Sequence, residues 1–341
     1  MSSSEPKSIW PFRLSPSLLL SIALLFPLQL LGAEQSDPPA PYVVPQTEKS
    51  DRFDSMEASR NYLSEKITSF ASNIDRFFGG DRHYQESNPS VIQLSAARGD
   101  GYGTNRNFDL AAKINLRLPV TEGRLRLLVE TDPEENAITG ATPAQAKTVL
   151  PSNKAVASKS VAVAVRVAAA EENVWYFNTD AGIQFPIPPK PFVRTRGSYS
   201  TPMGDWRLKA AESVYWFNNL GAGETTQLDL ERILSNSVLF RSTTNATYLN
   251  DKKNFDLRQD LSFYHTLNDR TALLYQASAI GVSKPQLQVT DYVALLSYRY
   301  RLHKEWLFFE TIPQLHFPRE KSFKASPALN IRLEILFDDT R

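Results

Sequence analysis

The sequence predicts an all-β protein, in which about 12 to 14 strands close into a transmembrane antiparallel up-and-down β-barrel behind a short N-terminal periplasmic helix. From Val91 onward, apolar residues recur at every second position, as in strands with one apolar face. These alternating segments run about ten to thirteen residues, whereas a typical soluble strand has about five or six. The connections between them are alternately short and long, as expected for an outer-membrane barrel.

The first 33 residues have the organisation of an export signal. Two basic residues precede an apolar run from Leu18 to Leu31, and the small residues Gly32 and Ala33 follow it. We therefore expect residues 1–33 to be a cleaved signal peptide, with an uncleaved anchor as the alternative. The chain has no cysteine, which excludes disulfides, thiolate metal ligands and a lipid-modified N-terminal cysteine.

Two short segments separate the export signal from the strands. Residues 34–51 include a proline-rich stretch and should form an extended linker. Residues 52–80 carry apolar side chains three or four positions apart, from Met56 to Phe77, and end at two glycines. This pattern predicts one amphipathic periplasmic helix. The helix either plugs or docks on the barrel, or only covers its periplasmic rim.

Residues 89–341 predict the barrel itself. In the clearest strand, residues 107–118, every even-numbered residue is apolar, whereas the odd-numbered ones include Asp109, Lys113 and Arg117. Similar alternation predicts about fourteen strands, or twelve if the irregular stretch from Pro186 to Phe217 is discounted. Tight links at residues 121–123, 171–173, 203–205, 235–237, 267–270 and 303–305 should be the periplasmic turns, and longer ones at residues 99–106, 132–158 and 318–326 should face outward.

Composition separates the membrane classes. A mean hydropathy of −0.33 and 22% charged residues exclude a helical membrane protein, but not a barrel whose strands are apolar on one face. A soluble periplasmic β-protein would also alternate and stays the alternative. Strand length and aromatics near strand ends, such as Trp175 and Trp206, favour the membrane. A net charge of +1 gives no argument for nucleic acid as a partner.

The charged face of the strands should line the lumen, where arginines modestly outnumber acids. Such a wall either borders a water-filled path or pairs into a closed plug of salt bridges. About fourteen strands favour a narrow or occluded channel, because a barrel of this size lies between a filled small barrel and an open porin. The lumen-lining candidates for selectivity are Arg117, Arg126, Arg166, Arg194, Arg196, Arg207, Arg258, Arg299, Arg301, Glu310 and Arg332.

The last predicted strand, Asn330 to Phe337, resembles the terminal strand of bacterial outer-membrane barrels, which their assembly machinery recognises. It departs from that pattern by four residues after the terminal aromatic. The resemblance implies that the assembly signal consists of Ile331, Leu333, Ile335 and Phe337.

From about Phe77 onward the chain also resembles an uncharacterised family of exported proteobacterial outer-membrane β-barrels. In that family a helix ending in a segment like Asp75 to Asp81 precedes the strands. The resemblance implies the cell outer membrane as the location and supplies no activity.

Little in the sequence suggests catalysis, and we predict no catalytic, cofactor-binding or metal-binding residue. Among the four histidines only His316 occupies a strand position that should face the lumen, as do the nearby Glu310 and Gln314. We interpret it as an ordinary polar group of the lumen. The glycine run from Gly99 to Gly103 leads into a strand and not a helix, so it reads as a turn tip. The acidic residues after Thr131 lack a calcium-loop pattern.

The expected function is therefore a porin-like outer-membrane barrel, a narrow pore or transport-related protein with a charged lumen and no cofactor. One alternative is an outer-membrane lipid hydrolase, which requires His316 within reach of a serine and an acid. The other is a structural or assembly barrel that binds a periplasmic partner through its helix, which an exposed apolar stripe would favour. We expect a monomer that contacts outer-membrane lipid and, during biogenesis, the barrel-assembly machinery.

Overall fold

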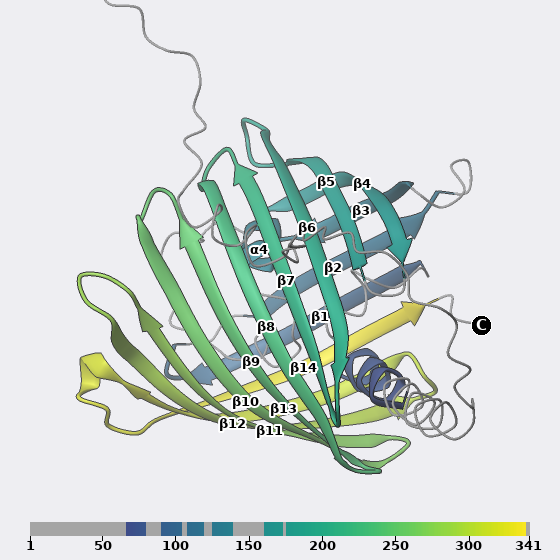
Figure 1. Cartoon of the computed structure of the whole chain (residues 1–341), viewed down its shortest axis with the longest axis vertical. Coiled ribbons are helices and arrows are strands. Elements are labelled where there is room, and N and C mark those ends of the chain that lie inside the picture. Colours follow the sequence, from purple (N-terminus) through teal and green to yellow (C-terminus); the bar gives the residue numbers. More distant parts are fainter. Residues whose placement is uncertain are drawn as a thin grey trace, which may run out of the picture. The chain divides into compact units, whose positions relative to one another are not determined.

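The computed structural model describes residues 66–79, 90–103, 108–118, 125–138, 160–172 and 175–338, and shows one closed barrel of fourteen strands (Figure 1). Each strand pairs antiparallel with its neighbours in the sequence, and β14 pairs with β1 to close the barrel. The strands are β1 (Val91–Gly101), β2 (Phe108–Arg117), β3 (Leu125–Thr131), β4 (Val161–Glu172), β5 (Trp175–Gln184), β6 (Lys190–Met203), β7 (Trp206–Phe217), β8 (Gly221–Ser235), β9 (Val238–Leu249), β10 (Asn254–Asn268), β11 (Thr271–Val282), β12 (Gln288–His303), β13 (Leu307–Pro318) and β14 (Ser326–Asp338).

The connections alternate between the two ends of the barrel as the sequence predicts. The short ones at residues 204–205, 236–237, 269–270 and 304–306 lie at one end, together with the start of β1 and the end of β14. We call this end the turn side and the opposite end the loop side. The predicted link at residues 121–123 lies outside the described residues.

The prediction of fourteen strands is confirmed, and the discounting of residues 186–217 is wrong. This stretch forms β6 and β7, which pair in unbroken register from Phe192↔Phe217 to Met203↔Trp206. Its alternation is weak in the sequence because β6 carries small and hydroxyl side chains, such as Gly197 and Ser198. Such side chains are neither clearly apolar nor charged, so they do not distinguish the two faces of the strand.

The two faces of the barrel differ in chemistry. On β4 the outward residues Val161, Val165 and Val167 are exposed, whereas Ala164 and Arg166 point inward and are buried. The same alternation holds on β7, where buried Arg207 and Lys209 alternate with outward apolar residues. The exterior is thus largely apolar, and the interior holds the charges.

The described residues include one short 3-10 helix, η3 (Arg319–Lys321), and two α-helical segments. The first spans residues 66–77 and is the described part of the helix predicted at 52–80. The second, α4 (Pro133–Ile138), lies in the long connection between β3 and β4. No helix among the described residues is both long and apolar enough for a membrane span. The predicted signal peptide (1–33), linker (34–51) and first part of the helix lie outside the described residues.

Candidate functional site: the barrel lumen

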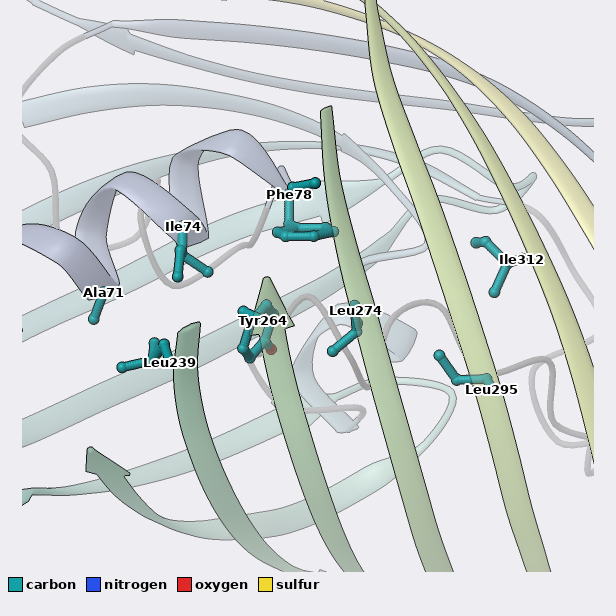
Figure 2. Packing of buried hydrophobic residues seen from close by; sticks show 9 residues of the cluster. Ala71, Ile74, Phe78, Leu239, Tyr264, Leu274, Leu295 and Ile312 are labelled. Carbon is teal, nitrogen blue, oxygen red and sulfur yellow. The ribbon is translucent and has the colours of Figure 1, made fainter. Parts of the chain in front are cut away.

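The helix of residues 66–77 packs inside the barrel and not only across its rim. Ile67, Ala71, Ile74 and Phe78 recur three or four residues apart and are almost completely buried. As Figure 2 shows, the last three face an apolar patch on the inner wall that includes Leu239, Tyr264, Leu274, Leu295 and Ile312. Ala272 also belongs to this patch. Burial of each large apolar side chain contributes about 1.5–3 kcal/mol, so this stripe stabilises the docked helix substantially.

Gly79 ends the helix against the wall. Its φ of +67° is the left-handed conformation that commonly follows the last turn of a helix. A Cβ there would meet Glu334 Oε1 at 2.7 Å, and the Gly79 carbonyl accepts a hydrogen bond from Gln93 Nε2 at 3.4 Å. Glycine therefore lets the chain take this left-handed turn close to the side chains of Gln93 on β1 and Glu334 on β14.

A network of buried ion pairs joins the helix to the wall. Arg241 on β9 donates from both terminal nitrogens to the carboxylate of Asp75 at 2.8 and 3.0 Å. The Nε of Arg241 contacts Glu231 on β8 at 2.7 Å, and Glu231 also accepts from Arg207 Nε on β7 at 2.7 Å. Tyr264 stacks under the Arg241 guanidinium at 5.1 Å. The bidentate pairing satisfies both charges in a region that excludes water.

A second network lies on β12 to β14 beside the helix. Arg299 pairs with Glu310 and Glu334, and its guanidinium lies 4.3 Å from the centre of the Phe308 ring. Arg301 lies 5.5 Å from the ring of Phe77 at the end of the helix. The helix therefore lies across the turn-side half of the lumen.

The segment α4 narrows the loop-side half of the lumen. Asn136 donates to Glu130 Oε2 at 3.0 Å, and Glu134 accepts a hydrogen bond from Asn219 in the β7–β8 connection. Ala137 packs in an apolar cluster with residues of β3, β4, β6, β7 and β9, including Phe217 and Leu249. Both halves of the lumen therefore hold a helical segment fixed to the wall.

The wall behind α4 contains a buried chain of alternating charges. Arg166 Nε contacts Asp180 Oδ1 at 2.6 Å, and Arg194 bridges Asp180 at 2.6 Å and Glu130 at 2.7 Å. The side chain of Asp180 is fully buried between two guanidinium groups. Among the described residues, Asp180 is the acidic side chain that pairs with Arg166, so its loss would leave a buried positive charge.

We predict that Asp180→Ala lowers the free energy of unfolding by about 3–5 kcal/mol, because it breaks a buried ion pair and leaves its partner charge behind. The matched control is Asp205→Ala, which removes an exposed pair with Arg232 at 3.3 Å and should cost about 0–1 kcal/mol. Denaturant unfolding of the two variants in the same lipid or detergent measures the difference. Equal costs would contradict the assignment of Asp180 to a desolvated lumen.

The structure places the predicted lumen residues as follows. Arg117 is exposed at the turn-side end of β2, in register with Arg126, which is buried. Arg258 lies in the inward phase of β10 and pairs with Asp260 at 2.8 Å. The others lie at positions that face the lumen. The networks above contain six of them: Arg166, Arg194, Arg207, Arg299, Arg301 and Glu310. Arg196 donates to Ser213 at 3.2 Å, and Arg332 is opposite Glu310 in register.

The predicted assembly residues lie on the outer face of β14, where Ile331, Leu333 and Phe337 are exposed. Phe337 stacks on Trp306 with 5.7 Å between ring centres. Their role in assembly stays a prediction.

The pairing partner of the helix was not predicted from the sequence. Asp75 and Arg241 are the two ends of the docking ion pair, and neither was a site candidate. The available signal was the run of apolar residues in the inward phase, such as Leu239, Leu274 and Ile312, because an apolar patch inside a charged lumen requires an apolar cover.

His316 has an acid beside it, and no serine of the described residues lies within hydrogen-bond distance of its ring. Its Nδ1 lies 2.8 Å from Asp291 Oδ2, and its Nε2 lies 3.2 Å from Gln314 Oε1. Ser326 is opposite in register, yet its hydroxyl donates to the Lys324 carbonyl at 3.3 Å. A catalytic histidine must face the nucleophile through Nε2, so this arrangement does not form a triad.

Tyr102 closes the same region from the β1–β2 connection. Its hydroxyl donates to Glu320 at 2.9 Å, its ring lies 5.1 Å from the His316 ring, and Lys321 sits over its face at 4.5 Å. Burial, assisted by Glu320, raises the pKa of the Tyr102 phenol well above its usual value. The phenol therefore remains a neutral donor that ties two loop-side segments together.

A closed, even-stranded antiparallel barrel with an apolar exterior and a charged interior is a transmembrane β-barrel, since the closed sheet satisfies every backbone group and presents apolar side chains to lipid. The lumen of this barrel holds two docked segments. The described residues identify the protein as a transmembrane β-barrel and do not identify a narrower class of barrel.

No family model and no curated protein matches the chain. Among solved structures it is similar to the NanC porin, with 7% identity, TM-score 0.38, and 72% of this chain and 98% of that chain covered. It is also similar to the outer-membrane channel DcaP of Acinetobacter baumannii, with 10% identity, TM-score 0.39 and coverages of 73% and 96%. OprB of Pseudomonas putida gives 9% identity, TM-score 0.44 and coverages of 73% and 94%. With similarities this low, the function rests on the geometry of the chain itself.

Proposed function

We propose that this chain is an outer-membrane barrel that provides a narrow, charge-lined path for small polar solutes, with residues 66–79 holding the turn-side half of the path closed. The observation that carries the proposal is the docking of an amphipathic helix inside a charged lumen through one bidentate ion pair and one apolar stripe. A barrel whose only task was to anchor in lipid would need neither a polar interior nor a helix docked inside it.

Three further assignments belong to this proposal. The outer membrane is the location, because even-stranded antiparallel barrels of this kind are the spanning form of that membrane. The turn side faces the periplasm, because short turns and both barrel termini lie there in outer-membrane barrels. Membership of the exported proteobacterial family that the sequence resembles is consistent with both.

The proposal treats the chain as a non-enzymatic barrel. The lipid hydrolase needs a serine on the free side of His316, and Gln314 occupies that side. The assembly barrel needs an exposed apolar stripe on the helix. In the described helix, the stripe from Ile67 to Phe78 is buried against the wall instead.

Planar-bilayer recording of the refolded chain tests the pore. We expect small and intermittent conductance steps, because the lumen is obstructed at both halves and opens only when a segment leaves its place. If neither the whole chain nor a chain lacking residues 66–79 conducts after verified insertion, the pore proposal is wrong.

A further inference from the structure

Acidic and basic side chains differ in exposure from the middle of the lumen to its turn-side end. Asp75 on the docked helix is buried. So are the acids that face the lumen from the strands of this region, among the side chains that the structure describes: Asp180, Asp229, Glu231, Asp260, Glu310 and Glu334. Four lumen-facing basic residues of the same region are exposed or partly exposed, and we call them the basic lining: Lys113, Arg117, Arg301 and Arg332.

The buried acids are compensated by buried arginines of the same wall. Glu231 accepts hydrogen bonds from Arg207 and Arg241, each at 2.7 Å. Glu334 pairs with Arg299. Opposite charges at such short distances cancel most of each other's field farther away. Water in this part of the lumen therefore meets little negative charge from the wall.

Arg301 and Arg332 show the opposite arrangement. Among the described residues neither forms an ion pair, although Glu310 is opposite Arg332 in register. The Arg301 guanidinium lies 5.5 Å from the centre of the Phe77 ring and 5.7 Å from that of Phe308. Aromatic faces hold a cation without neutralising its charge. The positive charge of these two arginines therefore extends into the lumen.

The surfaces around the basic lining are small or neutral. Between β14 and β2, the strand β1 presents Ser95 and Ala97 to the lumen, and Ala97 is opposite Arg332 in register. Next to Lys113 on the same face of β2 lies Ala111, which is exposed. The exposed residues of the described helix include no acid: Lys66, Thr68, Ser69, Ser72 and Asn73.

The exposed acids of the lumen lie at the other end. Asp109 is near the loop-side start of β2, and Glu135 belongs to α4. Asp256, which is partly exposed, is near the loop-side start of β10. The charge that faces water is therefore positive from the middle of the barrel to the turn side, although arginines and acids are almost balanced along the wall as a whole.

We propose that the path through this barrel selects small anionic solutes, such as those with a carboxylate or phosphate group, and that the basic lining attracts them. A charged passage with walls of low dielectric constant concentrates ions of opposite sign by about 10- to 1,000-fold and repels ions of the same sign. Arginine suits this role because its planar guanidinium stays charged and matches both anions. The inference rests on the proposed function, since it requires water in the lumen.

The charge preference can be measured at a single thiol, because the chain has no cysteine of its own. Ala111→Cys places a thiol at an exposed lumen position beside Lys113. The refolded whole chain is treated with two methanethiosulfonate reagents, one with a sulfonate and one with a trimethylammonium group. Each rate is divided by the rate of the same reagent with a free small thiol.

We expect the corrected rate to be at least about five-fold higher for the sulfonate reagent at low ionic strength. The preference should nearly vanish at about 1 M salt, where the Debye length is about 3 Å. Equal rates, or faster reaction of the cationic reagent, overturn the inference and leave the pore intact. A thiol in the folded barrel that reacts with neither reagent contradicts both the inference and the proposed function, because the lumen then excludes water.

Variants of the basic lining identify the source of the preference. Arg301→Gln combined with Arg332→Gln should lower it several-fold in the Ala111→Cys background, and Lys113→Gln alone should lower it less. The matched control is Arg232→Gln, which changes an exposed arginine that lies over Trp206 on the outer face near the turn side. Heat-modifiability verifies that each variant folds. The inference is wrong if the lining variants keep the full preference or if Arg232→Gln lowers it equally.

Ion selectivity of the open channel gives an independent measurement. In planar bilayers with a potassium chloride gradient, the reversal potential should have the sign of chloride permeation. The same lining variants should shift it towards zero or reverse it. A conducting chain that prefers potassium contradicts the inference, whereas the absence of any conductance from the whole and truncated chains contradicts the proposed function.

Discussion

A chain that lacks residues 66–79 is expected to conduct several times more current than the whole chain, with longer openings. Removal of this segment takes away the apolar stripe from Ala71 to Phe78 and the carboxylate of Asp75, which together cover the inner wall of β9 to β13. The exposed wall then borders water through the turn-side half of the barrel. Single-channel recording in planar bilayers measures the change, after heat-modifiability has shown that the truncated barrel folds.

Asp75→Ala separates the role of the ion pair from the loss of the whole segment. A buried ion pair that loses one partner costs about 3–5 kcal/mol, and here that cost falls on the docked state of the helix. We therefore expect the fraction of time that the helix spends undocked to rise by roughly two orders of magnitude or more. The conductance of the open channel is still limited by α4, which narrows the loop-side half of the lumen. Asn73→Ala, an exposed position on the same helix, is the matched control and should leave the open fraction unchanged. Equal conductance of the truncated and whole chains would show that the helix does not obstruct the path.

An arginine in the middle of the outer face is expected to destabilise the barrel far more than an arginine at its end. Val165 lies in the middle of β4 and Leu267 near the turn-side end of β10, and their exposed fractions are similar, 43% and 47%. In a bilayer, Val165→Arg should cost about 2–4 kcal/mol and Leu267→Arg about 0–1 kcal/mol, because the cost of a lipid-facing charge depends on its depth.

Reversible unfolding in phospholipid vesicles measures both variants. A soluble barrel would tolerate both substitutions within about 0.5 kcal/mol, since exposed positions rarely affect stability by more. A small and equal effect at the two positions would therefore contradict the membrane assignment. The comparison is informative because exposure is matched and only depth differs.

The sequence predicted the barrel well because each strand repeats one local rule. The alternation on β2 and β4 follows from the two-residue period of a strand, and counting such segments gives the number of strands in the barrel. The rule failed on β6, where Gly197, Ser198 and their neighbours give no contrast between faces. The short turns were also predictable, because two-residue links leave little choice of geometry.

The lumen was less predictable, because its contacts join residues far apart in the chain. Asp75 meets Arg241 across 166 positions of sequence, and no local pattern marks that pair. The apolar stripe of the helix was visible, but its partner patch is assembled from one or two residues on each of five strands. Only the register of the closed barrel brings Leu239, Leu274 and Ile312 together.

The central claim is that this chain is a folded barrel in the outer membrane, and fractionation of cells that express the whole chain tests it most directly. The account predicts that the protein sediments with the outer membrane and resists extraction by salt and high pH. It also predicts that the band migrates differently on a gel before and after boiling, as a closed barrel does. Recovery of the protein in the soluble periplasmic fraction, with no heat-dependent change in migration, would contradict the account.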